Sequence, residues 1–304
     1  MEDTNYKRRT LFLWLDDKQF HAINAKRRGV DTAKVYKDIP VILKIIRRIH
    51  IKINLFPVSI WLESWKRDLH KYDTVIIHAS ILTSIVVKYL NKKDPNLRII
   101  VWYWNPISKS EKVEKFSESL CEVWTFDIHD AKKYNLKYNS QYYFHDIILD
   151  KSKETEKILF VGGDKGRYDM LIELQNEISK FNILTDFHIT QTSKSTNSNK
   201  YKKRISYNSI LKKIAESTAI LDIVSEGQSG LTLRPLEALF FEKKLITNDK
   251  SMIEWDFYHP NNIFILGIDN LSCLHKFMGS DIYHFPNQKK MYYDFDMWLT
   301  RFFK

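Results

Sequence analysis

The sequence has few cysteines and no long apolar run. Its two cysteines, Cys121 and Cys273, lie far apart and without metal-ligand spacing, which predicts buried thiols in a reducing compartment. No apolar run approaches the roughly 18–20 residues that cross a bilayer. The N-terminal MEDTNYKRRT has no apolar segment behind its charges, unlike a signal peptide. We therefore expect a cytoplasmic protein.

Acidic residues are scarce in the first third of the chain. Residues 1–110 contain 21 Lys and Arg against 10 Asp and Glu, whereas residues 111–304 contain 27 of each, so the net charge of +11 belongs to the first third. A one-sided basic surface suits nucleic acid, an anionic membrane leaflet or an anionic substrate. It also suits a merely solvated lysine-rich face. Composition alone leaves these alternatives open.

One basic segment has helical periodicity. Residues 41–51, VILKIIRRIHI, place apolar side chains on a wide stripe, with Lys44, Arg47 and Arg48 on the other side. Such a helix can lie on an anionic membrane, or it can be a core helix with a solvated face. Nucleic-acid binding has less support, because the sequence lacks a helix-turn-helix, zinc or RNP-type pattern.

Predicted strands and helices alternate along the first half. Residues 18–40 are polar and basic and give no assignment, while residues 61–69 have the spacing of an amphipathic helix. Strands alternating with helices predict an α/β domain with a mainly parallel sheet. The predicted strands of this half are 10–15, 74–78, 98–104 and 122–126. Its remaining predicted helices are 81–90 and 127–135.

The stretch 219–249, AILDIVSEGQSGLTLRPLEALFFEKKLITND, predicts a complete βαβ unit. Ala219–Val224 is an apolar, β-branched run typical of a strand buried on both faces. A helix is predicted from Thr232 or Leu233 to Phe241, and Leu245–Thr247 begins the next strand. A βαβ unit forces parallel pairing, and ligands of open α/β sheets bind beyond the carboxyl ends of the strands. We therefore expect the ligand near residues 225–237.

A second glycine-containing loop precedes this unit. KILFV at 157–161 predicts a strand, GGDKGR at 162–167 a loop, and the next residues a helix to about Lys180. A loop with Lys165 and Arg167 that leads into a helix N-terminus is a candidate anion site. It matches neither GxGxxG nor GxxxxGK[ST].

Together these patterns predict two Rossmann-like α/β domains that face a central cleft. A polar, charged linker at 150–156 separates domain 1–150 from domain 151–286, and residues 287–304 form an aromatic helix that packs across the domains. The second domain has groups for a diphosphate: the cations Lys165, Arg167 and Arg234, and the amides near Gly162, Gly163 and 229–231. Glu237 could accept hydrogen bonds from ribose hydroxyls, or it could be a helix-terminal carboxylate stabilised by the macrodipole.

The segment SEGQSGLTLRPLEALFFEKKLITND resembles the donor-binding segment of GT-B fold glycosyltransferases, particularly bacterial enzymes of lipopolysaccharide, capsule or exopolysaccharide synthesis. WDFYHPNNIFIL, FVGGDKGRYDML, YDTVIIH and VWYWNP are similar to further segments of that group. The resemblance implies a nucleotide-sugar donor, UDP-linked, in the C-terminal domain. It implies a glycan or lipid-linked acceptor in the N-terminal domain, and a protein that is cytoplasmic or peripheral on the inner membrane face.

The resemblance also implies a set of site residues. Many retaining members have two glutamates seven residues apart; Glu237 matches the second, but the first position is Ser229, and Glu226 is out of register. The implied donor residues are Gly162, Gly163, Lys165, Arg167, Gln228, Ser229, Gly230, Leu231, Thr232, Arg234 and Glu237.

The reaction implied by the resemblance needs no catalytic metal and no cofactor besides the nucleotide-sugar co-substrate. Asp294-Phe295-Asp296 resembles the DxD metal motif of the other glycosyltransferase fold, but it lies in the predicted terminal helix rather than after a strand. If the reaction inverts configuration, a general base must come from the acceptor side. Asp17 is the first candidate, followed by Asp16 and His78. Alternatives are a nucleic-acid or nucleotide-binding module without catalysis, and a nucleotide-sugar epimerase of similar fold.

Overall fold

The computed structural model describes residues 5–53, 57–150, 155–193, 195, 200–224 and 230–304. The chain forms two compact units. The first comprises Met1–Gln141 and Arg301–Lys304, together with a short stretch that includes Gly230 and Leu231; the second comprises Tyr142–Gln228 and Thr232–Thr300. The chain therefore passes from one unit to the other at residues 141–142. Most of the predicted linker, 151–154, lies outside the described residues.

The described part of the first unit contains a six-stranded parallel sheet in the order β2-β1-β3-β4-β5-β6. Its central strands are continuous apolar runs such as TLFLW and RIIVWY, and their residues are almost all buried. Such runs are expected where helices cover both faces of a sheet. The strands are β1 (Thr10–Trp14), β2 (Asp31–Lys34), β3 (Thr74–His78), β4 (Arg98–Tyr103), β5 (Glu122–Thr125) and β6 (Lys137–Tyr138).

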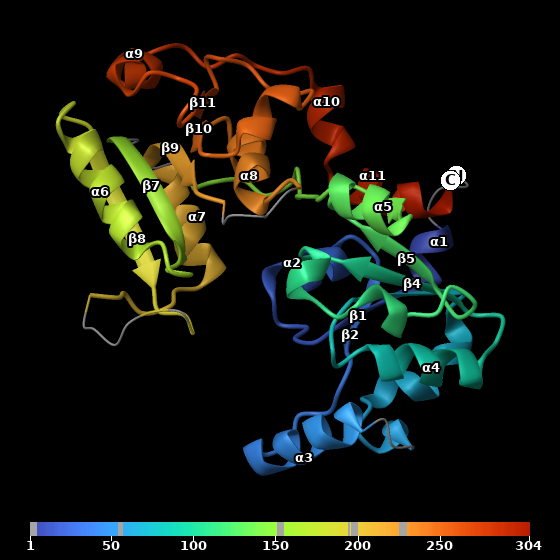
Figure 1. Ribbon diagram of the computed structural model, residues 1–304. Coiled ribbons are helices and arrows are strands. Elements are labelled where there is room, and N and C mark those ends of the chain that lie inside the picture. The colour runs from blue at the N-terminus through green and yellow to red at the C-terminus, as the bar shows by residue number, and fades with distance from the viewer. Residues whose placement is uncertain (1–4, 54–56, 151–154, 194, 196–199, 225–229) are drawn as a thin grey trace. The chain divides into compact units, whose positions relative to one another are not determined.

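The helices of the first unit differ in how they begin and pack. Asp127 caps α5, as the sequence predicts, and accepts hydrogen bonds from the amides of His129 and Asp130 at 2.9 and 3.2 Å. In Figure 1, α3 lies at the margin of this unit, away from the strands. The helices are α1 (Asn5–Arg8), α2 (Phe20–Arg27), α3 (Val41–Lys52), α4 (Ser84–Lys93) and α5 (Ile128–Tyr134).

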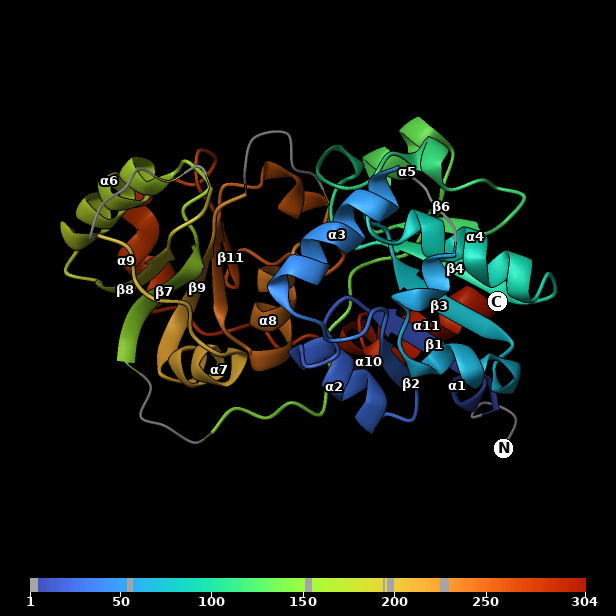
Figure 2. The same ribbon diagram turned by 90° about the horizontal axis from the view of Figure 1, so that it is seen from below.

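Within the described residues, the second unit contains a five-stranded parallel sheet, ordered β11-β10-β9-β7-β8. Helices α6 and α7 flank β7 from opposite sides (Figures 1 and 2). The strands are β7 (Thr155–Gly163), β8 (Leu184–Thr190), β9 (Ser217–Asp222), β10 (Lys244–Thr247) and β11 (Ile263–Ile265). The helices are α6 (Tyr168–Ser179), α7 (Tyr207–Ala215), α8 (Leu233–Phe241), α9 (Leu274–Met278), α10 (Asn287–Tyr292) and α11 (Phe295–Thr300).

Each sheet reverses its winding at its first strand along the chain, β1 in the first unit and β7 in the second. In the first unit, β2 and β3 lie on opposite sides of β1; in the second, β8 and β9 lie on opposite sides of β7. Loops that leave adjacent strands in opposite directions open a crevice at their carboxyl ends, where ligands of open α/β sheets bind. Each unit therefore has a candidate ligand position, after β1 and β3 in the first and after β7 and β9 in the second.

The C-terminal segment is not the continuous helix that the sequence predicts. It forms α10, α11 and a 3₁₀ turn at Arg301–Phe303. Helix α10 ends because Asp294, which is fully buried, caps α11 through the amide of Asp296 and also accepts the His145 amide at 3.0 Å. Phe302 packs in the first unit, with its ring 4.8 Å from that of Trp124.

Three other expectations need correction. Residues 61–69 form no continuous helix but two 3₁₀ turns, Ser64–Arg67 and the start of Leu69–Lys71. Residues 18–40, which the sequence leaves unassigned, contain α2 and β2. Cys121 is buried as predicted, whereas Cys273 is exposed. Over the described ranges, no helix has the length and apolar character that crossing a membrane requires.

Candidate functional site

A pocket of about 220 Å³ lies at the reversal point of the second sheet. Its walls come from residues 160–167 around the end of β7, residues 221–224 around the end of β9, and residues 232–234 at the start of α8. Gly162 and Gly163 of the predicted loop line the pocket, as do the cations Lys165, Arg167 and Arg234. The structure thus brings together two segments that are about sixty residues apart in the sequence.

Arg167 joins the two strand ends that form this pocket. Its guanidinium donates to the carbonyl oxygen of Ile223 and, at 3.3 Å, to that of Gly163, and it lies 5.3 Å from the centre of the Phe160 ring. The buried Nε has no hydrogen-bond partner among the residues that the structure describes. Burial lowers the pKa of this guanidinium against the opposing effect of Asp222. A partly buried cation with an unused donor suits an anionic ligand.

The predicted anion site at the start of α6 is occupied by the protein's own carboxylate. Asp164 accepts the amides of Arg167 and Tyr168 at 3.0 and 2.8 Å, and its second oxygen accepts the Tyr201 hydroxyl at 2.9 Å. The Lys165 amide donates to Thr192 Oγ1 at 3.1 Å. These amides are therefore unavailable to a phosphate, which corrects the prediction for this part of the loop.

Gly163 packs closely against Thr192. A Cβ at this position would lie 2.6 Å from Thr192 Cγ2, so Thr192 would have to move and release the Lys165 amide. Gly163→Ala is expected to lower the free energy of unfolding by about 1–3 kcal/mol, measured by urea denaturation. The double variant Gly163→Ala/Thr192→Ser removes the clashing methyl group and should restore most of the loss. An unchanged stability in the single variant would contradict this packing argument.

The N-terminus of α8 is the remaining helix end in the pocket. Thr232 precedes the helix, but its hydroxyl donates to Asp222 at 2.6 Å rather than capping α8. Of the predicted donor residues in this loop, Gln228 and Ser229 lie outside the described residues, as does Glu226. Gly230, with a φ of 88°, and the buried Leu231 belong to the first unit.

The partly buried Arg234 and the buried Glu237 form an ion pair one turn apart on α8. Arg234 donates to one carboxylate oxygen of Glu237 and, at 3.3 Å, to the carbonyl of Val161, while the Tyr207 hydroxyl donates to the other oxygen. The Tyr207 hydroxyl also meets that of Tyr143 at 2.7 Å. Glu237 is completely buried. Both carboxylate oxygens are therefore engaged inside the protein, and the ribose contact of Glu237 stays a prediction.

The electrostatics of this pair follow from its burial. Burial raises the pKa of the Glu237 carboxyl, and the neighbouring Arg234 and Tyr207 only partly offset that rise. Burial lowers the pKa of Arg234, but the Glu237 carboxylate outweighs it and leaves that pKa above its ordinary value. The charged form of each side chain is therefore stabilised by the opposite charge of the other. Glu237 and the Val161 carbonyl together fix the position of Arg234 in the pocket wall.

The first unit has an aromatic cluster at its own reversal point. The His78 ring, at the end of β3, lies 4.4 Å from that of Trp14 at the end of β1 and 5.4 Å from that of Trp104 beyond β4. His21, from α2, lies 4.9 Å from Trp104. The buried atoms His78 Nε2 and Trp14 Nε1 have no hydrogen-bond partner within the described ranges. Of these rings, the partly exposed Trp104 offers an aromatic face to a ligand.

The predicted general bases of the first unit differ in their environment. Burial, with a smaller effect of His21, lowers the pKa of His78 to about 3, so the imidazole is neutral at pH 7. Asp16 is exposed and accepts the Lys18 amide at 3.1 Å, and Asp17 is partly exposed. Sequence reasoning missed His21, because it lies in the polar segment 18–40. Its burial also lowers its pKa to about 3.

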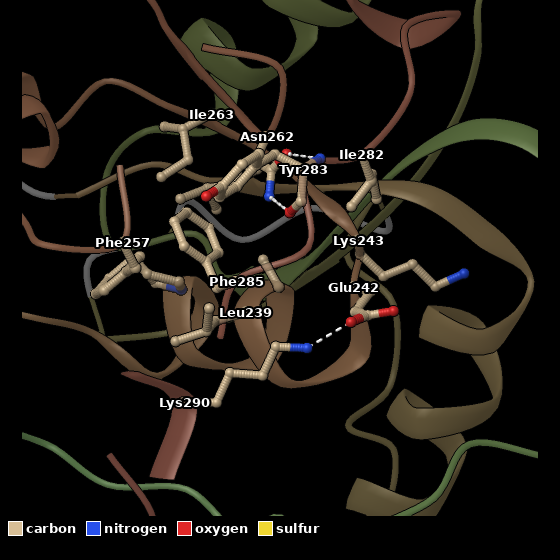
Figure 3. Close-up of a pocket in the computed structure, with 13 residues that line it drawn as sticks. Leu239, Glu242, Lys243, Phe257, Asn262, Ile263, Ile282, Tyr283, Phe285 and Lys290 are labelled. Carbon is tan, nitrogen blue, oxygen red and sulfur yellow. Dashed lines mark hydrogen bonds and ion pairs between the residues drawn. The ribbon is translucent and has the colours of Figure 1, made fainter. Parts of the chain in front are cut away.

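A second concavity of the second unit is too small to be a ligand site. The apolar pocket in Figure 3 lies against α8, near Leu245 and Ile263 at the amino ends of β10 and β11. Glu242, which also lines it, pairs with Lys290. Its cavity volume of about 20 Å³ accommodates about one water molecule. It also lies at the amino ends of these strands, opposite the edge where ligands of such sheets bind.

No group of His, Cys, Asp or Glu side chains suited to a metal ion occurs among the described residues. Asp294 and Asp296 do not form such a group. Asp294 accepts the His145 Nδ1 at 2.8 Å and caps α11. The DxD-like motif is therefore explained by helix capping.

Two solved structures are similar to this chain in fold. TarM from S. aureus, in complex with Fondaparinux, alpha-GlcNAc-glycerol and UDP, superimposes with a TM-score of 0.51 and 14% identity over 76% of this chain. A Listeria monocytogenes protein assigned as UDP-N-acetylglucosamine 2-epimerase gives a TM-score of 0.51 and 8% identity over 98% of this chain and 95% of its own. The chain has the GT-B fold. It spans 54% of TarM. Neither a family model nor a curated protein matches the sequence.

Proposed function

We propose that the chain is a glycosyltransferase that binds a nucleotide-sugar donor, UDP-linked, in the pocket of the second unit. The observation that carries this proposal is Arg167, a partly buried cation with an unused Nε donor at the point where the second GT-B sheet reverses its winding. Ligands of such sheets bind at that point, and an arginine there suits a phosphate. The UDP in the TarM complex, which has the same fold, gives further support.

The proposed chemistry is displacement at the anomeric carbon. An acceptor hydroxyl oxygen forms the new bond to that carbon, the bond from the carbon to the diphosphate oxygen breaks, and the diphosphate leaves with the electron pair. Arg167 and the N-terminus of α8 would stabilise the leaving charge. Lys165 adds a further positive charge at the rim, and Arg234, which is positioned by Glu237, lines the floor. No metal is required in this scheme.

The proposed acceptor is a glycan or lipid-linked saccharide of bacterial surface polysaccharide synthesis, bound by the first unit. If the reaction inverts configuration, the hydroxyl proton passes to a base of that unit. Asp17 suits this role better than His78, because the lowered pKa of His78 makes its imidazole a weak proton acceptor at neutral pH. The partly exposed ring of Trp104 would stack against a sugar.

Binding of nucleoside diphosphates tests the proposal directly. Thermal shift and calorimetry with UDP, GDP and CMP should show one preferred ligand for the wild type. Arg167→Gln is expected to weaken its binding about 10- to 100-fold, because one charge-assisted hydrogen bond is lost. Arg167→Lys, which keeps the charge, should lose less. Arg204→Gln is a matched control, because Arg204 is exposed on the same unit. Binding of none of the three nucleotides, or a short DNA duplex as the only ligand, would refute the proposal.

An epimerase is the second candidate. The Listeria protein assigned as a UDP-N-acetylglucosamine 2-epimerase corresponds to this chain over nearly the full length of both. The two functions differ in what they require, because an epimerase changes its nucleotide-sugar without an acceptor. Incubation with UDP-N-acetylglucosamine alone, followed by proton NMR, should leave the sugar configuration unchanged if the chain is a transferase.

A further inference from the structure

We propose that α3 docks the protein on an anionic membrane surface. The helix presents a broad apolar face to solvent: Val41 is 71% exposed, Ile42 72%, Ile45 53% and Ile49 56%. Isolated exposed apolar residues are ordinary, but a contiguous patch marks an interaction surface. The proposal is independent of sugar transfer, because α3 supplies no residue to the nucleotide pocket.

The opposite side of α3 is the side that attaches the helix to its own unit. Arg47 donates to the carbonyl of Lys37 at 3.3 Å and stacks over the Tyr36 ring, with its guanidinium carbon 4.5 Å from the centre. The Trp61 indole donates to His50 Nδ1 at 2.6 Å, and Ile51 is 5% exposed. Because attachment uses these residues, the isoleucine face is directed away from the first unit.

Charge identifies the partner of this face. Lys44, Arg48 and Lys52 are all exposed, and at spacings of four residues they form one row along the helix. The neighbouring row consists of Ile45, Ile49 and Ile53. No aspartate or glutamate occurs from residue 39 to residue 62. A basic row beside an apolar row fits a bilayer interface, where isoleucines enter the acyl boundary and the long cationic side chains reach anionic headgroups.

Vesicle sedimentation tests this docking surface. The full chain should bind phosphatidylcholine vesicles that contain phosphatidylglycerol and bind pure phosphatidylcholine vesicles much less. Lys44→Gln/Arg48→Gln/Lys52→Gln should weaken binding to the anionic vesicles about 100-fold, at about fivefold per charge, and added salt should weaken it likewise. Ile42→Gln/Ile45→Gln/Ile49→Gln should weaken binding at least about tenfold.

The controls separate docking from folding and from self-association. Ile148→Gln/Ile268→Gln removes exposed apolar side chains elsewhere and should bind vesicles as the wild type does. Unchanged UDP affinity and circular dichroism would show that the α3 variants are folded. Equal binding of the α3 variants and the wild type to anionic vesicles would overturn the proposal. So would self-association in light scattering that the isoleucine variant abolishes while the wild type ignores vesicles.

Discussion

Arg234→Met is expected to lower the free energy of unfolding by about 3–5 kcal/mol, because it leaves the Glu237 carboxylate buried without its cation. Glu237 is completely buried, and one of its carboxylate oxygens accepts a hydrogen bond from Arg234. The remaining Tyr207 hydroxyl donates to the other oxygen but cannot neutralise the charge. Urea denaturation followed by circular dichroism measures the loss.

A double-mutant cycle separates the charge from the packing. Glu237→Gln removes the buried charge and keeps the shape, so Arg234→Met/Glu237→Gln should be clearly more stable than Arg234→Met alone. If the two single changes are simply additive, the pair is not coupled and our account of Arg234 is wrong. This coupling also means that loss of ligand binding in an Arg234 variant reports on folding, whereas Arg167→Gln reports more directly on the ligand.

Acidification from pH 7 to pH 5 is expected to cost the first unit about 2 kcal/mol of stability for each of His21 and His78. Burial lowers both pKa values from 6.5 to about 3. The unfolded chain therefore binds protons below pH 6.5 that the folded chain does not take up until about pH 3. The free energy of unfolding therefore has its full value above pH 6.5 and decreases progressively as the pH falls toward 3.

Thermal unfolding across this pH range checks the prediction. His21→Phe and His78→Phe keep an aromatic ring and remove the titrating group, so each should flatten the dependence of Tm on pH. His284→Gln is the control, because the side chain of His284 is 72% exposed. Parallel Tm curves for His78→Phe and the wild type would show that His78 is not kept neutral by the fold.

Much of the fold follows from local patterns. The runs at β1, β3 and β4 are apolar throughout, and parallel strands buried on both faces need that composition. The strand-loop-helix-strand order around α8 was predicted and is confirmed. Asp127 as the cap of α5 was equally local, since its side chain bonds amides two and three residues ahead.

The failures come from partners that are distant in the sequence. Residues 61–69 have helical spacing, but the backbone of Leu62 pairs with Tyr36 in an antiparallel bridge, and the Trp65 indole donates to the Val35 carbonyl at 3.1 Å. The edge strand β2 was missed because DTAK is short, polar and partly exposed. No periodic signal identifies such a strand, since its position is fixed by pairing with β1.

The candidate site was only partly predictable for the same reason. Gly163, Arg167 and Arg234 do line one pocket, as their places after strands and before a helix indicate. That Asp164 fills the start of α6 follows from a turn geometry that composition does not reveal. The burial of Glu237 depends on Tyr207 and Tyr143, which come from other segments.

The return of Arg301–Phe303 to the first unit has a consequence for synthesis on the ribosome. The Arg98 guanidinium donates to the Phe302 carbonyl at 2.6 Å, and Arg301 donates to Asn139 Oδ1 at 2.6 Å and to Ser140 Oγ at 2.8 Å. These partners leave the ribosome some 160 residues or more before Arg301 does. Until the second unit has been translated, the nascent first unit therefore lacks Phe302, and the surface around Trp124 stays uncovered.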